Sequence, residues 1–174
     1  MEPCVDALKE WAGKANATII YDSTVDEFTD NGLFNKVKGK PNIAVIGFTT
    51  DGDVFGGFFR FVVWNQHERF YDPNMFIFSF ESHGRCKTPQ RFDVKEGLKE
   101  SAYVIFWKNG NGCVAFYVDG LGFSLGNERS DSCCLDMSRV FEGIQDTTLT
   151  GKNGWLFEKD KHHCVRLVAV KLGN

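Results

Sequence analysis

The sequence predicts a mainly β domain of the α+β class, built as a sandwich of two antiparallel sheets with short flanking helices. Of its 174 residues, 17 are phenylalanine, a residue type that favours half-buried strands over helices. Short apolar runs follow one another along the chain, separated by turns rich in glycine, asparagine and aspartate, without long helical segments between them. Short strands joined by hairpin turns are typical of an antiparallel sandwich.

An amphipathic helix is predicted at the start of the chain, over residues 3–14. Apolar residues at helical spacing, including Leu8 and Trp11, define one face, and Gly13 is suited to end the helix. We assign residues 1–16 to this helix, packed on the domain, and residues 17–174 to the domain itself.

Two short helical segments are expected after a first strand at residues 17–21. Thr24 and Glu27 have the spacing of a capping box, and Asn31 with Gly32 then interrupts the helix. A second helical segment follows and ends at Gly39, because the next proline bars its continuation.

The rest of the chain has the period of β-strands. Turn residues at 50–53, 109–112 and 119–120 separate the runs. The stretch 126–155, rich in serine, threonine, aspartate and glycine, is expected to form long surface loops. The predicted strands cover residues 43–50, 54–64, 75–80, 103–107, 113–118, 122–125 and 164–172.

The charge balance excludes several classes of function. Twenty basic residues oppose 23 acidic ones, for a net charge of -3, which argues against nucleic-acid binding by a basic face. The short run Lys36, Lys38 and Lys40 fits a solvated helix end. Because neither a secretion signal nor an apolar run long enough for a membrane is found, we expect a cytoplasmic protein with reduced cysteines and no membrane insertion.

Metal and cofactor binding are not expected. Histidine and cysteine, the residue types that bind zinc, occur close together at three places in the sequence. These are His83 with Cys86, Cys133 with Cys134, and residues 162–164 (His-His-Cys). These spacings are not those of a tetrahedral zinc site, and adjacent side chains on a strand point to opposite faces.

Catalytic patterns are equally weak, so the chain is not expected to be an enzyme. Residues 122–126 match Gly-x-Ser-x-Gly, but this nucleophile motif requires a strand-to-helix turn that the surrounding β-rich sequence does not offer. The carboxylate pairs Asp51 with Asp53 and Glu96 with Glu100 are interpreted as solubilising charges.

The order of several motifs resembles the TLDc domain over nearly the whole chain. The segments 82–91 and 143–151 further resemble a variant of this domain found in amoebal proteins. The motifs that carry the resemblance are Thr-Ile-Ile-Tyr-Asp-Ser at 18–23, Gly-Lys at 39–40, Gly-Asp-Val-Phe-Gly-Gly-Phe at 52–58 and Phe-Ile-Phe-Ser at 76–79.

The resemblance implies a sandwich flanked by short helices and a role in protein interaction. Members of this family include oxidation resistance proteins, and several bind the vacuolar proton-pumping ATPase; no enzymatic activity is established for the fold. Two positions that are usually acidic in animal and fungal members are Asn74 and Val168 here, which weakens the expectation of pump binding more than that of the fold.

Two sets of residues are singled out. The motif positions are interpreted as structural, with phenylalanines filling the core and glycines allowing close packing; they are Val54, Phe55, Gly56, Gly57, Phe76, Phe78 and Ser79. Loops on a rigid sandwich commonly carry recognition, so the candidate interaction residues are Asp119, Gly120, Gly122, Glu128, Arg129 and Asp131.

Two alternatives to a protein-interaction module remain open, as does the oligomeric state. Trp64, Trp107 and Trp155 suggest a sandwich that binds a small molecule or a glycan, or a hydrolase of an undescribed kind. Redox chemistry at the adjacent thiols Cys133 and Cys134 would need activation by a nearby cation, for which Arg129 and Arg139 are the candidates.

Overall fold

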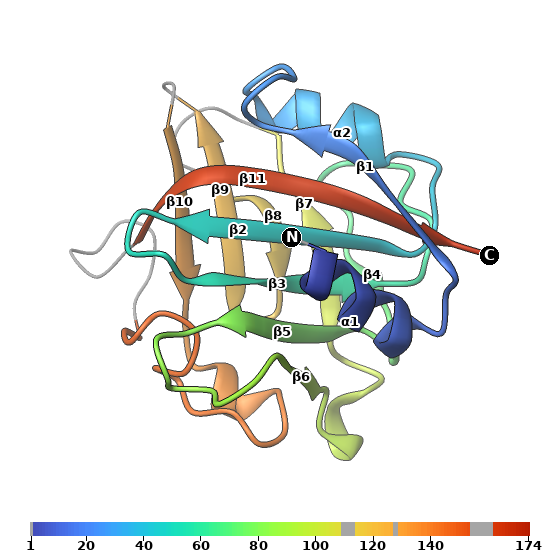
Figure 1. Cartoon of the computed structure of the whole chain (residues 1–174). Coiled ribbons are helices and arrows are strands. Elements are labelled where there is room, and N and C mark those ends of the chain that lie inside the picture. The colour runs from blue at the N-terminus through green and yellow to red at the C-terminus, as the bar shows by residue number, and fades with distance from the viewer. Residues whose placement is uncertain (1, 109–113, 127–128, 154–161) are drawn as a thin grey trace.

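The computed structural model describes residues 2–108, 114–126, 129–153 and 162–174 (Figure 1). In chain order, the elements are α1 (Glu2–Ala12), β1 (Asn16–Asp22), α2 (Asp30–Val37), β2 (Ile43–Thr49), β3 (Val54–Phe59), β4 (Phe70–Tyr71), β5 (Phe76–Glu81), β6 (Gln90–Asp93), the 3-10 turn η1 (Glu96–Leu98), β7 (Tyr103–Phe106), β8 (Val114–Val118), β9 (Leu121–Gly126), β10 (Arg129–Cys134), the 3-10 turn η2 (Met137–Arg139) and β11 (His162–Gly173). The predicted mainly β class with short helices is confirmed.

The strands form one antiparallel ladder, in the order β4-β7-β8-β9-β10-β11-β2-β3-β5-β6, with β1 also paired to β11. We expected two separate sheets, but every strand belongs to this ladder. In Figure 1 the ladder turns back on itself, so that β7 to β10 lie behind β2, β3 and β5 and run across them. The long strand β11 pairs with β10 through its first residues and with β2 through the remainder, which joins the two layers.

The main core lies between the two layers. Phe55 of β3 stacks on Phe123 of β9 with ring centroids 5.5 Å apart, and Phe59 of the same strand lies 6.1 Å from Phe116 of β8. A Cβ atom at Gly57 would come within 3.1 Å of the Val118 side chain. The glycine therefore sets how closely β3 approaches the rear layer.

A second, smaller core covers the outer face of the front layer. Helix α1 buries Leu8 and Ala12 there, together with residues of β2, β3, β5 and β11. Trp11 stacks on Phe80 at 5.7 Å and contacts two further phenylalanines of β5. The amphipathic helix predicted from the sequence thus packs on the sheet (Figure 1).

The helical segments predicted after β1 are wrong in detail. Thr24 does not begin a helix; its backbone and hydroxyl both donate to the Asp22 carboxylate. Helix α2 begins instead after Thr29, whose hydroxyl accepts a hydrogen bond from the Gly32 N–H. Asn31 and Gly32 therefore lie inside the helix, because the cap at Thr29 satisfies its first turn.

Several strand predictions also differ from the structure. Strand β3 ends at Phe59 rather than at residue 64, and the short strands β4 and β6 were not expected. The stretch 126–155, expected to be loops, contributes β10, which pairs with both β9 and β11. The turns at 50–53 and 119–120 form as predicted, whereas the one at 109–112 lies outside the described residues.

No helix in the described part of the chain has the length and apolar character needed to span a membrane.

Candidate functional site

The family motif residues lie on the paired strands β3 and β5 in the front layer. Phe55 faces Ser79 and Gly56 faces Phe78 in the antiparallel register. A Cβ atom at Gly56 would lie 2.0 Å from the carbonyl oxygen of Val45, so only glycine fits there. Val54 is half-buried, and the other six motif residues are buried. Their contacts give them a packing role.

The candidate interaction residues do not all lie in loops. Asp119 and Gly120 form the two-residue turn between β8 and β9, with φ angles of 24° and 113°. Gly122 lies in β9 and Asp131 in β10, where each is paired with a neighbouring strand. Arg129 is the first residue of β10, and Glu128 lies outside the described residues. The structure therefore places only Asp119 and Gly120 at a turn.

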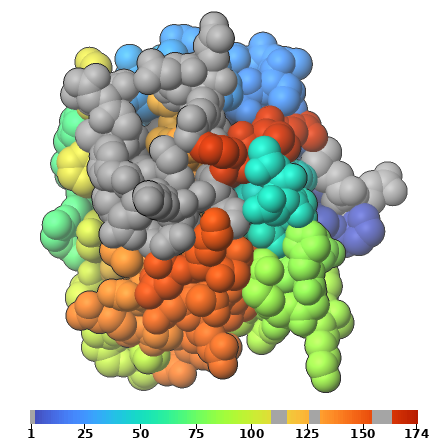
Figure 2. Space-filling model, turned by 90° about the vertical axis from the view of Figure 1, so that its left-hand side faces the viewer, coloured from blue at the N-terminus to red at the C-terminus, as the bar shows by residue number. Residues whose placement is uncertain are grey.

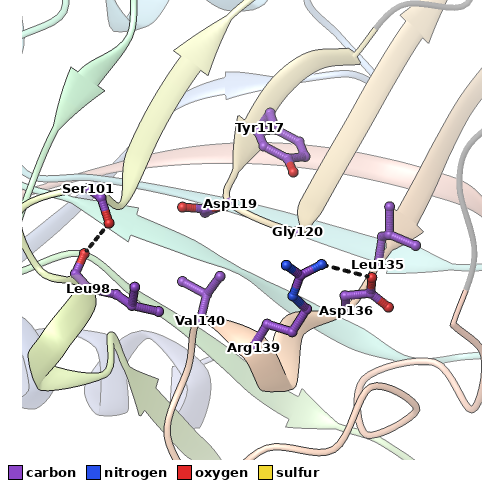
Figure 3. A pocket seen from close by; sticks show the side chains of 9 residues that line it. All are labelled: Leu98, Ser101, Tyr117, Asp119, Gly120, Leu135, Asp136, Arg139 and Val140. Carbon is purple, nitrogen blue, oxygen red and sulfur yellow. Dashed lines mark hydrogen bonds and ion pairs between the residues drawn. The ribbon is translucent and has the colours of Figure 1, made fainter.

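A hollow of about 500 Å³ opens between this turn and the segment that follows β10 (Figure 3). In Figure 3 the Tyr117 hydroxyl points into the hollow, with Arg139 and Val140 on its opposite side. The lining comes from η1, the turn, and the region of η2, which are far apart in the sequence. The nine lining residues are Leu98, Ser101, Tyr117, Asp119, Gly120, Leu135, Asp136, Arg139 and Val140.

A row of tyrosines leads from the hollow to the sheet edge. Tyr117 of β8 lies 5.8 Å from Tyr103 of β7, and Tyr103 lies 6.4 Å from Tyr71 of β4, measured between ring centroids. The guanidinium of Arg69 covers the Tyr103 ring at 4.5 Å, a cation–π contact. The sequence did not predict this row. Its signal was one tyrosine, Tyr103 or Tyr117, in each of two strands whose other residues are apolar.

Burial shifts the pKa of two groups on the upper wall of the hollow. Burial raises the pKa of the Asp119 carboxyl, although the backbone N–H of Tyr103 and the charge of Arg69 oppose this effect. Burial, together with the neighbouring Tyr103 and Asp119, also raises the pKa of Tyr117. Tyr117 therefore keeps its proton, and its hydroxyl is hydrogen-bonded to the side chain of Tyr103.

The lower rim of the hollow carries charge. Arg139 and Asp136 form an ion pair with 3.7 Å between nitrogen and oxygen, and the Arg139 side chain is 79% exposed. The Ser101 hydroxyl donates to the carbonyl of Leu98 at 3.1 Å. With a phenol, a half-buried carboxyl and a guanidinium around an open space, the hollow is equipped to hold a polar side chain of a bound molecule.

An ion cluster around the buried Asp53 carboxylate links two segments far apart in the sequence. The Asp53 side chain, 2% exposed, accepts from Arg85 Nη2 at 2.5 Å and contacts His83 Nδ1 at 2.8 Å. Arg85 also donates to the carbonyls of Thr148 and Leu149. The segments 82–91 and 143–151 therefore lie side by side, in green and orange in Figure 2. Our interpretation of Asp53 as a solubilising charge is wrong, because it is buried and paired.

The thiols are poor candidates for redox chemistry. Cys134 is buried in the main core, and this burial raises the pKa of its thiol well above the ordinary value. Cys133 is also buried, and the five described cysteines form no disulfide. Within the described ranges no three histidine, cysteine, aspartate or glutamate side chains converge as a metal site would require. A buried, protonated thiol is a weak nucleophile.

The remaining catalytic patterns have structural explanations. Ser124, the centre of the Gly-x-Ser-x-Gly match, lies inside β9, where its hydroxyl accepts from the backbone N–H of Asp131. Glu96, which the sequence offered as one of a carboxylate pair with Glu100, forms a salt bridge with Lys99. His163 lies opposite Asp131 in the β10–β11 register, and their side chains form a short hydrogen bond.

Three other hollows lined by described residues have volumes of about 710, 270 and 300 Å³. Asn74 lines the first of these, and Cys4 the second. Trp64 and Trp107 are exposed and line none of the four hollows, and Trp155 lies outside the described residues. The two described tryptophans that suggested a small-molecule site therefore lie outside these four hollows.

A comparison with protein families gives one match. The model of the TLDc domain matches residues 5–167, from within α1 to within β11. A search of the curated proteins finds no match.

Proposed function

The chain belongs to the TLDc domain family, and from this premise we propose that it is a non-catalytic protein-interaction module of the oxidative-stress response. One observation carries the proposal: the residues that define the family are used to pack β3 against β5 and the rear layer. A motif that builds a rigid scaffold leaves function to the surface.

The hollow beside Asp119 supports a binding role. Its lining comes from three separate segments, and its upper wall offers a protonated phenol at Tyr117 beside a half-buried carboxyl. A recognition site of this kind requires hydrogen-bonding groups that are held in place, and the tyrosine row holds Tyr117 from one side.

Within this proposal, subunits of the vacuolar proton-pumping ATPase are the partners to test first, at the cytoplasmic face of the pump. The family resemblance supports this choice. Two positions weigh against it: Val168 is fully buried beneath α1, and Asn74 is exposed but uncharged. Without the usual acidic groups, contacts elsewhere on the surface must provide the affinity.

The proposal is tested by affinity capture from extracts of oxidant-treated and untreated cells, with the wild-type chain and two variants. The double variant Tyr117→Phe with Asp119→Asn removes the polar groups of the hollow. Asp6→Asn, on the exposed face of α1, is the matched control. We expect the wild type and the control to capture the same proteins and the double variant to lose them.

Failure to capture any protein, pump subunits included, would overturn the interaction role. Capture that is equal for the wild type and the double variant would preserve that role and remove the hollow as its site.

A further inference from the structure

Four aromatic side chains are exposed on two segments that pack together. They are Phe61, Trp64, Tyr71 and Trp107, which are 49%, 57%, 49% and 38% exposed. Three lie in the segment 60–71, and Trp107 follows β7, against which that segment packs. We call these four residues the aromatic surface. Other large apolar residues exposed in the described part of the chain, such as Val25 and Val165, are aliphatic and lie elsewhere in the sequence.

Contacts hold parts of this surface against neighbouring segments. Trp64 packs over Gly39, with 3.2 Å from its ring to a Cβ position at the glycine. Three residues further on, His67 meets the Trp107 ring edge-on at 5.5 Å. Tyr71 borders Tyr103, which joins the aromatic surface to the tyrosine row. Exposed aromatic side chains that cluster in this way mark interaction sites more often than scattered ones do.

The segment that carries the aromatic surface is held firmly although it has little regular structure. Its first residue, Arg60, donates its backbone N–H to the buried carboxylate of Asp72 at 2.5 Å. Further along, the Val63 carbonyl accepts from Gly39, and the His67 N–H donates to the Phe106 carbonyl at 2.7 Å. A surface that is already ordered loses less conformational entropy when it binds.

The charge around the aromatic surface is positive, although the chain as a whole carries -3. Three carboxylates on or beside the segment oppose the cations: Glu68, the buried Asp72, and Asp119, which interacts with Arg69. Arg60 also lines a hollow together with Asp93, Glu96 and Glu142. The cations on the segment or directly beside its contacts are Lys38, Lys40, Arg60, Arg69 and Lys108. An excess of positive charge favours a negatively charged partner and repels basic ones.

We propose that the aromatic surface docks an acidic segment of a partner protein. Apolar side chains of that segment pack against Trp64 and Trp107, while its carboxylates face Lys38, Lys40 and Lys108. Tryptophan, tyrosine and arginine dominate the energetic centres of protein interfaces. This inference rests on the proposed interaction role and adds to it a surface and a partner chemistry.

The probe is a synthetic peptide of glutamate and aspartate with a central Phe-Leu pair, compared with its glutamine and asparagine counterpart. Binding to the full chain is followed by calorimetry at low and high salt. We expect the acidic peptide to bind, its affinity to fall with salt, and the amide peptide to bind at least about tenfold more weakly.

Two variants locate the binding. Trp64→Ser with Trp107→Ser removes the centre of the aromatic surface and is expected to weaken peptide binding at least about tenfold. Val25→Ser with Val165→Ser removes exposed apolar side chains elsewhere and is expected to leave binding unchanged. Circular dichroism establishes that both variants are folded.

Three results would overturn the inference: no binding of the acidic peptide, equal binding of the amide peptide, or equal losses in the two variants. Binding to phosphatidylserine-containing vesicles without binding to the peptide would assign the surface to a membrane instead. If the tryptophan variant still captures the same proteins from extract, the interaction role stands and this surface is wrong. If the wild type captures none, the interaction role itself fails.

Discussion

Ser79 combines full burial with a hydroxyl oxygen that has no hydrogen-bond partner among the described residues. A buried hydroxyl without a partner costs free energy that an apolar side chain of similar size does not. We therefore expect Ser79→Ala to leave the free energy of unfolding unchanged or to raise it by about 1 kcal/mol, as measured by urea denaturation. A loss of stability beyond that range would mean that the hydroxyl is bonded, for example to a water molecule.

Asp22 and Arg166 form an ion pair in which two oxygens accept from the guanidinium. The pair, with help from Thr24, lowers the pKa of Asp22 to about 2, from 3.8. Because this pKa is lowered in the folded state, the stabilisation is present above pH 4 and is lost as the pH falls towards 2.

The variant Asp22→Asn tests this pair. At neutral pH it should be less stable than the wild type by about 1 kcal/mol, after allowance for solvent screening. The difference should shrink as the pH falls through the interval between the two pKa values. Chemical denaturation across this pH range provides the measurement, with Asp6→Asn as an exposed control. A difference that does not change with pH would contradict the assignment.

Arg85 joins the segments 82–91 and 143–151. It pairs with the Asp53 carboxylate and donates to the carbonyls of Thr148 and Leu149. Replacing it by glutamine removes the cation beside the buried Asp53 carboxylate and leaves its contact with His83. We expect Arg85→Gln to lower the free energy of unfolding by about 3 kcal/mol. Arg139→Gln, which removes an exposed pair, should cost about 0.5 kcal/mol or less.

Hydrogen exchange separates this explanation from a general loss of stability. In Arg85→Gln, the amides of 82–91 and 143–151 should exchange faster than those of β2 and β3. Uniform acceleration over the whole chain would show that Arg85 does not act as a local clamp.

Helix α1 attaches to the sheet through Leu8, Ala12 and the partly buried Trp11. The Trp11 side chain makes the aromatic contacts. Its ring contacts Phe76, Phe78 and Phe80 at centroid distances of 6.3, 6.2 and 5.7 Å. Trp11→Ala should lower the free energy of unfolding by about 3 kcal/mol, whereas Trp64→Ala, on the aromatic surface, should change it by less than about 0.5 kcal/mol. Equal effects of the two variants on the melting temperature would refute this packing.

The sequence predicted those elements whose pattern is local. Strands β2, β5 and β11 are rich in apolar and β-branched residues, and their period was recognised. Strand β10 was missed because Arg-Ser-Asp-Ser-Cys-Cys has little strand propensity; its pairing with β9 and β11 decides its conformation. Likewise, Gly32 indicated a helix break, but the cap at Thr29 outweighs it.

The candidate site, which is assembled from distant parts of the molecule, could be predicted only where it coincides with a turn. The Asp-Gly pair at 119–120 predicted an exposed hairpin tip, and the hollow of Figure 3 lies beside it. Arg139 and Leu98 reach that hollow through tertiary folding, which no local pattern indicates. The same holds for Trp107 and the segment 60–71, because contacts between distant segments create the aromatic surface.

We divide the molecule into a scaffold, which holds the family motif, and a surface to which we assign the proposed binding. Phe78→Leu tests this division most directly, because Phe78 belongs to the motif and is fully buried. We measure the amount of partner that this variant captures at a temperature where circular dichroism shows it folded. We expect the variant to lose about 1 kcal/mol of its free energy of unfolding, which lowers its melting temperature. We expect it to capture as much partner as the wild type does. Capture lost by the folded variant would contradict this division, since the motif itself would then take part in binding.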